Sequence, residues 1–234
     1  APVTATITVT PEYDNSCIGT PVTFRITVNP TPMVNTIADR TVCNGNSIPA
    51  ITFGTPTTPA NLVTYSWTND QPGIGIAAAG TTSSIPAFTA TNNSNSPVTA
   101  SITVTPKYNN SCTGAPMTFS ITVNPTAKVN TIANQTVCNG TSMPAIAFGT
   151  PTTPANLVTY SWTNDQPGIG IAAAGTTSSI PAFTATNNGT APVTATITVT
   201  PEYDNSCTGP TMTFSITANA PVIAGTIKGN PFVC

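Results

Sequence analysis

Charged side chains are scarce in this sequence, and histidine is absent. Asp, Glu, Lys and Arg make up 5% of the 234 residues, and the formal net charge is −2, whereas about a quarter of the residues of an ordinary soluble domain are charged. So few cations leave no electrostatic footprint for nucleic acid or for an anionic membrane surface. Without histidine the chain also lacks the commonest general base and metal ligand. We therefore expect no enzyme, no cofactor, no metal ion and no nucleic-acid partner.

Helical periodicity and long apolar runs are also missing. No segment repeats its apolar residues every 3.6 positions, so we expect essentially no helix. No apolar run approaches the ~20 residues of a membrane span. Disorder does not fit either, because 39% of the residues are hydrophobic and they alternate regularly along the chain. These absences leave β-structure.

The chain is organised by a long repeat. Residues 53–93, which read FGTPTTPANLVTYSWTNDQPGIGIAAAGTTSSIPAFTATNN, return unchanged as residues 148–188, an offset of 95 residues. The same offset separates Cys17, Cys112 and Cys207. A period of about 95 residues is too long for one turn of a solenoid and suits one small domain. The pattern predicts a string of such domains.

Within each period, apolar and hydroxyl side chains alternate. In residues 97–105 and 116–123 the apolar residues share one face and Thr or Ser the other, which predicts two half-buried antiparallel strands joined by a hairpin loop. Val63, Tyr65 and Trp67 alternate with Thr and Ser, which predicts a central strand with an aromatic core face. Shorter strands are expected near residues 36–42, 49–53, 74–77 and 85–91.

About seven short strands per period, with a Trp on about the third, indicate an all-β fold of tandem immunoglobulin-like sandwiches. We expect complete domains at residues 34–124 and 129–219, joined by proline-containing linkers that stiffen the connection. Residues 1–29 would be the closing hairpin of a truncated repeat, and residues 222–234 the first strand of a following one. The chain would then be a window of a longer repetitive polypeptide, or one unit of a filament completed by its neighbours.

Several motifs carry a family resemblance: TVCNG, YSWTNDQPGIG, IPAFTATN, and PVTATITVTPEY followed by SCTG and TFSITVNP. With these the whole chain resembles the PKD-like, immunoglobulin-like tandem repeats of very large secreted and surface proteins from gliding-type Gram-negative bacteria. The resemblance implies a β-sandwich spacer or adhesin stalk, exported and often attached to the cell surface, and it implies no reaction. The acidic WDFGDG-like element of better-known PKD domains is degraded here to SWTNDQPG, which leaves any role for that loop open.

Six cysteines, five of them at the 95-residue repeat spacing, suggest disulfides and an oxidising, extracytoplasmic compartment. Two pairings respect the repeat: Cys43–Cys112 and Cys138–Cys207 within domains, or Cys17–Cys43, Cys112–Cys138 and Cys207–Cys234 across linkers. We favour the first, because the opening strand of such a sandwich starts at the end that carries the last hairpin loop. A strand of about ten residues, ~30 Å long, also follows Cys17, and a disulfide spans at most about 7 Å between Cα atoms. Cys17 and Cys234 would then pair outside this chain.

The few acids form no convincing site. The only close pairs lie in a hairpin loop, at Glu12/Asp14 and Glu202/Asp204, so solvated loop charges explain them better than a hydrolytic carboxylate pair does. A calcium site around Asp70 would need several more oxygen ligands. The run PGIGIAAAG contains no Lys and precedes no helix, so it is not a phosphate cradle. We expect Trp67 and its repeat equivalent Trp162 in the core and not as sugar-stacking platforms.

Threonine, serine and asparagine occupy the surface positions that usually carry Lys and Glu. These residues could simply be good strand formers, but two functional interpretations compete: a glycan coat, and subunit packing in a fibre. The glycosylation candidates, from Asn-x-Ser/Thr sequons and TPTTP loops, are Thr57, Thr58, Thr152, Thr153, Asn92, Asn109, Asn134, Asn139 and Asn188.

We therefore predict a non-enzymatic structural repeat of an extracellular fibre or bacterial surface stalk. It would be disulfide-stapled and glycosylated, and its partners would be copies of itself or further repeats. The alternative is an adhesin module that binds carbohydrate or another cell surface through repeated loops such as NDQPGIG.

Overall fold

The computed structural model describes residues 1–222, which fold into two compact units. The first unit comprises Ala1–Asn93 and Pro97–Asn124, and the second comprises Ser94–Ser96 and the chain from Pro125 onward. Within the described residues all regular structure is β, apart from four single-turn 3-10 helices, none of which could cross a membrane. The expected strand in residues 222–234 falls almost entirely outside the described part of the chain.

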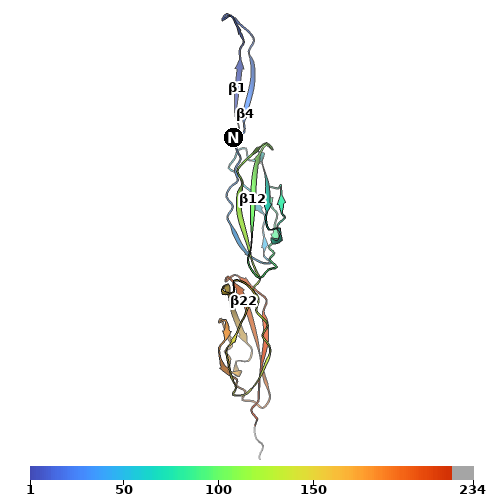
Figure 1. Cartoon of the computed structure of the whole chain (residues 1–234), viewed down its shortest axis with the longest axis vertical. Helices are drawn as coiled ribbons and strands as arrows, with labels where there is room; N and C mark the ends of the chain where they lie inside the picture. The colour runs from blue at the N-terminus through green and yellow to red at the C-terminus, as the bar shows by residue number, and fades with distance from the viewer. Residues whose placement is uncertain (223–234) are drawn as a thin grey trace, which may run out of the picture. The chain divides into compact units, whose positions relative to one another are not determined.

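One large sheet forms the first layer of the first unit (Figure 1). Its strands lie in the order β5 (Arg40–Cys43), β14 (Met117–Asn124), β12 (Val98–Tyr108), β8 (Val63–Asn69) and β9 (Ala79–Gly80), and β13 (Cys112–Thr113) pairs with the end of β12. All neighbours are antiparallel except β5, which runs parallel to β14. The predicted hairpin of residues 97–105 and 116–123 is the β12–β14 pair.

Two short antiparallel pairs form the facing layer. They are β6 (Ser47–Ile48) with β11 (Phe88–Thr89), and β7 (Ile51–Thr52) with β10 (Ser84–Ile85). Their registers are continuous, so Pro49 and Pro86 interrupt what would otherwise be one long pair of strands. Proline has no N–H to give to a ladder, which explains the two gaps.

The core lies between the layers. Trp67 is 3% exposed, and the rings of Phe53 and Tyr65 pack with centroids 5.5 Å apart. Ile102 and Ile121, from the hairpin, are fully buried in the same cluster. The strict alternation of buried and exposed residues along β8 matches the alternation in the sequence. The expectation that Trp67 is a core residue is confirmed.

The prediction of a strand at residues 74–77 is wrong. Ile74 ends a 3-10 turn, Pro72–Ile74, and the regular strand β9 begins only at Ala79. Gly75 follows with φ of 99°, and a Cβ there would lie 2.2 Å from the carbonyl oxygen of Thr89. Ile74 and Ile76 are nevertheless buried, so their alternation marks burial of an irregular segment and not a strand.

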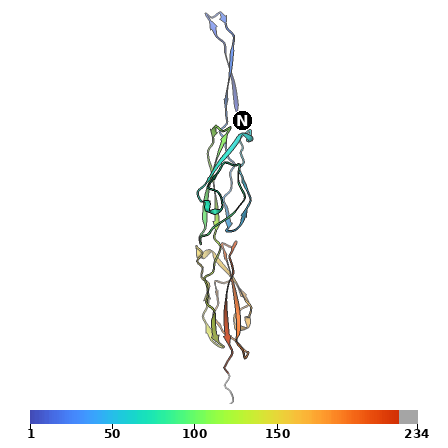
Figure 2. The ribbon, with the colours of Figure 1, turned by 90° about the vertical axis from the view of Figure 1, so that its right-hand side faces the viewer.

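The second unit repeats this architecture (Figure 2). Its large sheet has the order β15 (Gln135–Cys138), β24 (Met212–Asn219), β22 (Val193–Tyr203), β18 (Val158–Asn164) and β19 (Ala174–Gly175), with β23 (Cys207–Thr208) on β22. Its facing pairs are β16 (Ser142–Met143) with β21 (Phe183–Thr184), and β17 (Ile146–Ala147) with β20 (Ser179–Ile180). The remaining 3-10 turns are Ala60–Leu62, Ala155–Leu157 and Pro167–Ile169. The predicted all-β, two-sheet immunoglobulin-like fold is confirmed.

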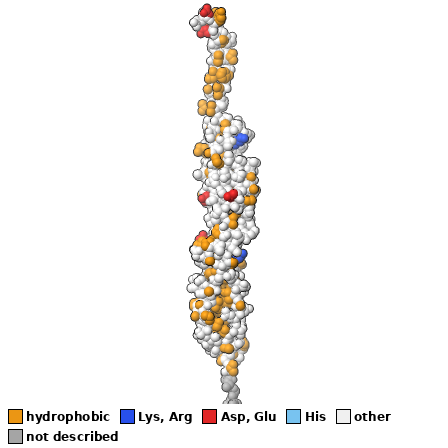
Figure 3. All heavy atoms as spheres, viewed as in Figure 1, with side chains coloured by type: hydrophobic (Ala, Val, Ile, Leu, Met, Phe, Trp, Pro, Cys, Tyr) orange, Lys and Arg blue, Asp and Glu red, His pale blue; other side chains and the backbone are white. Residues whose placement is uncertain are grey.

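A third copy of the closing hairpin lies at the N-terminus, in β1 (Val3–Val9) and β4 (Val22–Val28), with β2 (Glu12–Tyr13) and β3 (Cys17–Ile18) at its tip. Its register, which begins at Val3 opposite Val28, is that of Val98 opposite Val123 in β12–β14. Its apolar face is uncovered: Phe24 is 49% exposed, whereas the equivalent Phe119 is 2% exposed. Figure 3 shows the hydrophobic side chains gathered along this hairpin. The proposed domain boundaries, at residues 34–124 and 129–219, stay predictions.

Gly80 tests how tightly the core is packed. A Cβ at Gly80 would lie 2.5 Å from Cε2 and Cζ2 of Trp67, whereas one at Gly73 would meet no atom within 4 Å. We expect Gly80→Ala to lower the free energy of unfolding of the first unit by about 1–3 kcal/mol, and Gly73→Ala to change it by less than about 0.5 kcal/mol. Denaturant unfolding should be followed by the fluorescence of Trp67, with Trp162→Phe in every variant. Equal effects of the two alanines would show that the indole is loosely packed.

Because two tyrosines are buried, we expect the protein to lose stability at high pH. Burial raises the pKa of Tyr65, and a hydrogen bond with Thr55 only partly opposes the rise; burial also raises the pKa of Tyr160. The unfolded chain therefore loses these protons at a lower pH than the folded chain, so stability falls as pH rises above about 10. Denaturant unfolding at pH 8 and pH 11 should show that the double variant Tyr65→Phe, Tyr160→Phe loses less stability than the parent. An equal loss of stability in the parent and the double variant would show that groups other than Tyr65 and Tyr160 cause the pH dependence.

Candidate interaction surfaces

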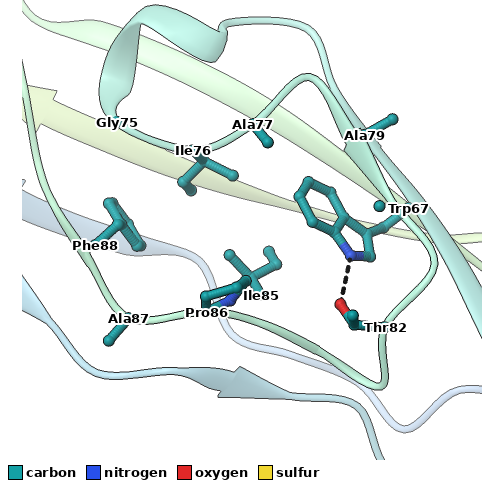
Figure 4. Close-up of a pocket in the computed structure, with 11 residues that line it drawn as sticks. Trp67, Gly75, Ile76, Ala77, Ala79, Thr82, Ile85, Pro86, Ala87 and Phe88 are labelled. Atoms are coloured by element: carbon teal, nitrogen blue, oxygen red, sulfur yellow. Dashed lines mark hydrogen bonds between the residues drawn. The ribbon is translucent and has the colours of Figure 1, made fainter.

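Each repeat has an apolar pocket beside its tryptophan. The pocket in the first unit is about 300 Å³ and that in the second about 340 Å³. Ile76, Ile85 and Phe88 line the first pocket together with Trp67 (Figure 4). None of the lining residues is titratable, so the pocket can perform no acid–base chemistry.

The tryptophan is part of the wall of this pocket and not a platform. Gly80 lies against the six-membered ring of Trp67, and the indole Nε1 donates a long hydrogen bond of 3.5 Å to Oγ1 of Thr82. The Thr82 hydroxyl in turn donates to the carbonyl of Ser84. Since Trp67 is 3% exposed, it cannot offer an open face for a sugar to stack on.

Three aspartate side chains accept hydrogen bonds from the backbone. Oδ1 of Asp70 accepts a hydrogen bond of 2.7 Å from the backbone N–H of Ser101, and Asp165 accepts one of the same length from Thr196. Asp39 does the same for Ser120. In residues 1–222 no group of three or more acidic, cysteine or histidine side chains could hold a metal ion. These three aspartates therefore act as structural acceptors.

The second repeat shows that this role needs no charge. Asn134 stands where the first repeat has Asp39, and its Oδ1 accepts a hydrogen bond of 2.8 Å from the N–H of Ser215. The amide oxygen replaces the carboxylate without a change of partner. The two repeats share a side-chain oxygen that accepts the hydrogen bond, but they do not share the negative charge.

The outward face of the closing hairpin carries paired hydroxyls. Oγ1 of Thr99 lies 2.8 Å from Oγ1 of Thr122, and the equivalent Thr194 and Thr217 are also 2.8 Å apart. Cross-strand pairs of this kind stabilise a sheet by about 0.2–1 kcal/mol each. The surface thus satisfies part of its own hydrogen-bonding capacity without charged residues.

Each unit has a shallow polar groove, on β8 in the first and on β18 in the second, and the two grooves differ in the sign of one charged residue. Thr64, Ser66 and Lys107 line the groove of the first unit, about 430 Å³. The groove of the second unit, about 380 Å³, has Glu202 at the position equivalent to Lys107. Where the repeats diverge, the change falls on one of the rare charged positions.

The structure separates the glycosylation candidates by exposure. Thr57, Thr152 and Asn92 are 8%, 0% and 5% exposed. Thr57 and Thr152 each accept a hydrogen bond from a backbone N–H, and Nδ2 of Asn92 donates to the carbonyl of Val123 at 2.7 Å. These three side chains are inaccessible in the folded chain. The exposed candidates are Thr58, Thr153, Asn109, Asn134, Asn139 and Asn188.

The predicted disulfide pairs Cys43–Cys112 and Cys138–Cys207 are not formed. Cys43 and Cys207 are disulfide-bonded, but Cys17, Cys112 and Cys138 are free thiols. Cys234 lies outside the described residues.

Strand direction explains this error. Because β5 runs parallel to β14, Cys43 lies opposite Asn124 at the C-terminal end of β14. Cys112 is in β13, where it lies opposite Tyr108 of β12. This position precedes the N-terminal end of β14. The two cysteines are therefore separated by the length of β14, about 25 Å, which no disulfide spans. The strand β5 begins at Arg40 opposite Ile121, part-way along β14, and Cys43 is its last residue.

Parts of the chain are similar to known proteins. Residues 40–127 match the model of the PKD-like domain family. The first repeat is therefore similar to PKD-like domains. The second repeat has the same topology and an unchanged copy of residues 53–93.

Solved structures agree with this fold. A two-domain fragment of DIP-gamma, IG1+IG2, has a TM-score of 0.50 at 10% identity, over 82% of this chain and 99% of that one. Drosophila N-cadherin EC1–4 has a TM-score of 0.48 at 12% identity, over 86% of this chain and 52% of that one, so the chain spans about half of that fragment. The first likeness supports the immunoglobulin-like fold alone, and the second is too loose to support an argument. No curated protein sequence matches the chain.

The acceptor role of the acids can be tested at Asp39. We expect Asp39→Asn to leave the free energy of unfolding within about 0.5 kcal/mol of the parent, because Asn134 already does this work in the second repeat. Asp39→Ala should cost about 1 kcal/mol, since the Ser120 N–H loses its acceptor. Chemical denaturation measures both. A large loss in the asparagine variant would show that the negative charge itself matters.

Proposed function

We propose that the chain is a structural segment of an extracellular fibre or surface stalk, in which each PKD-like domain supplies length. One observation carries this proposal: residues 53–93 and 148–188 are identical on the surface as well as in the core. Their internal hydrogen bonds also agree; Nδ2 of Asn69 lies 3.2 Å from the carbonyl of Ile76, and Nδ2 of Asn164 lies 3.1 Å from that of Ile171. A domain copied whole suits a spacer better than it suits a unique binding site.

The chemistry of the surface supports a role without catalysis. The pocket beside each tryptophan contains no titratable group, and the acids Asp39, Asp70 and Asp165 accept backbone hydrogen bonds. Immunoglobulin-like and PKD-like domains are typically structural or adhesive modules. An exported, mechanical role fits these features and the disulfide-bonded cysteines.

Glycans would complete this surface in the proposed role. With 5% charged residues, the chain has little of the charge that usually keeps protein surfaces apart. Sugars on the exposed candidates, among them Thr58 and Asn188, would supply hydration and shield the sheet edges. The intact mass of native material measures this directly.

Adhesion is the second candidate. The loop NDQPGIG contributes Gly75 to the rim of the apolar pocket, and Gly170 lies at the same place in the second repeat. Two equal weak sites on one chain would gain avidity. The same duplication that suits a spacer therefore also suits a multivalent adhesin.

Single-molecule stretching and ligand binding together test the proposal. A spacer of two equal domains should unfold, under reducing conditions, in two steps at similar force, each releasing about 95 residues, or about 300 Å of chain. It should show no saturable binding on a glycan array. Saturable binding that is lost in the double variant Asp70→Ala, Asp165→Ala, with both unfolding steps retained, would establish adhesion in place of the spacer role.

A further inference from the structure

The apolar pocket beside Trp67 is held open by the backbone around it. At one end Gly75 has φ of 99°, and a Cβ there would lie 2.2 Å from the carbonyl oxygen of Thr89. At the other end a Cβ on Gly80 would lie 2.5 Å from the six-membered ring of Trp67. The segment between these two glycines is therefore fixed at both ends by close contacts. Such a pocket is formed before a ligand arrives.

The walls of the pocket are apolar, and they are aromatic at both ends. Figure 4 places Phe88 and Trp67 at opposite ends, with Ile76 and Ile85 between them. Ile76 and Ile85 are 3% and 1% exposed, and Phe88 is half-buried. The volume of about 300 Å³ is twice that of an apolar cavity of about 150 Å³ that takes up benzene. The pocket therefore has the size and the walls to hold an aromatic ring system.

The lining also determines the charge of a ligand. All eleven lining residues belong to the described part of the chain, and none of them is charged. A charged ligand would lose its hydration here without gaining an ionic partner, which is costly. The polar side-chain groups of the lining are the indole N–H of Trp67 and the hydroxyl of Thr82. A neutral ligand with one polar group matches this lining.

The Thr82 hydroxyl can accept one more hydrogen bond. It donates to the carbonyl of Ser84, and it accepts only the long bond of 3.5 Å from Nε1 of Trp67. A hydroxyl oxygen has two lone pairs, so one of them is left for a ligand, and Thr82 is exposed. Thr177 is placed in the same way in the second unit, 3.4 Å from Nε1 of Trp162. The group that this oxygen takes is an O–H or an N–H.

We propose that each pocket binds a small neutral aromatic compound that carries one O–H or N–H donor, such as a phenol. The ring lies against Ile76, Ile85 and Phe88, and the donor bonds to Oγ1 of Thr82. The pocket of the second unit has the same residue types in its lining, so the chain binds two molecules. This binding activity goes beyond the spacer role, which needs no ligand.

Nuclear magnetic resonance of the full chain tests this proposal. The chain has two tryptophans, so its ¹⁵N–¹H spectrum contains two indole signals, one for each pocket, and Trp162→Phe assigns them. The probe is 2-naphthol, which is uncharged at pH 7. We expect both indole signals to shift saturably, with a dissociation constant of the order of 0.1–1 mM.

A filled pocket should lose this response. Ala77 lines the pocket and is exposed, and Ala77→Leu should abolish the saturable shift of the Trp67 signal while the Trp162 signal keeps its own. Ala172→Leu should give the reverse result in the second unit. Ala78→Leu is the matched control, because Ala78 is also exposed but does not line the pocket. In each variant the unaltered repeat shows that the chain has folded and that the probe is active.

The role of Thr82 is tested with a second probe. The ether 2-methoxynaphthalene has the same rings without an O–H, and it should bind the parent chain about 2- to 10-fold more weakly than 2-naphthol. In Thr82→Val the Trp67 signal should report equal affinities for the two probes.

Three results would overturn the proposal: no saturable shift with 2-naphthol, a Trp67 response that survives Ala77→Leu, or equal affinities of the two probes for the parent chain. Each would leave the spacer role untouched, because the two unfolding steps of the stretching experiment are measured without a ligand.

Discussion

The structure depends on covering one apolar sheet face. The same two-stranded hairpin occurs three times with one register, and in two of these copies a facing layer buries it. Phe119 and Phe214 are 2% exposed, whereas Phe24 in the uncovered hairpin is 49% exposed. Complete burial of such a side chain contributes about 1.5–3 kcal/mol. Local sequence is therefore enough to specify the ladder, but the facing strands supply the stability.

Local patterns predicted the elements that local chemistry determines. Alternation around Trp67 identified the central strand, and the spacing of strands identified the sandwich. The same signal was misleading at Ile74 and Ile76, where alternation reflects burial of an irregular segment shaped by Pro72 and by the left-handed Gly75. Apolar periodicity reports which side chains face the core, and it reports strands only where the backbone is free to extend.

Non-local features could not be derived in this way. The position of Cys43 depends on β5 running parallel to β14, and the sequence contains no sign of how far that strand extends before the cysteine. Sequons likewise describe three residues, whereas Asn92 is buried because its amide donates to Val123 in a distant strand. Both features, the position of Cys43 and the burial of Asn92, depend on contacts between segments far apart in the chain.

The large sheet offers little open strand edge despite its nearly neutral surface. Proteins usually place Lys or other charges on sheet edges to prevent pairing with other chains. Here the edges of the large sheet are formed by β5, of four residues, and β9, of two residues, so little unpaired backbone is offered. The hairpin β1–β4 is different, because each of its strands has seven residues and an open outer edge. Among the residues of these two strands only Arg25 is charged, so the open edges of this hairpin carry little of the charge that usually prevents pairing.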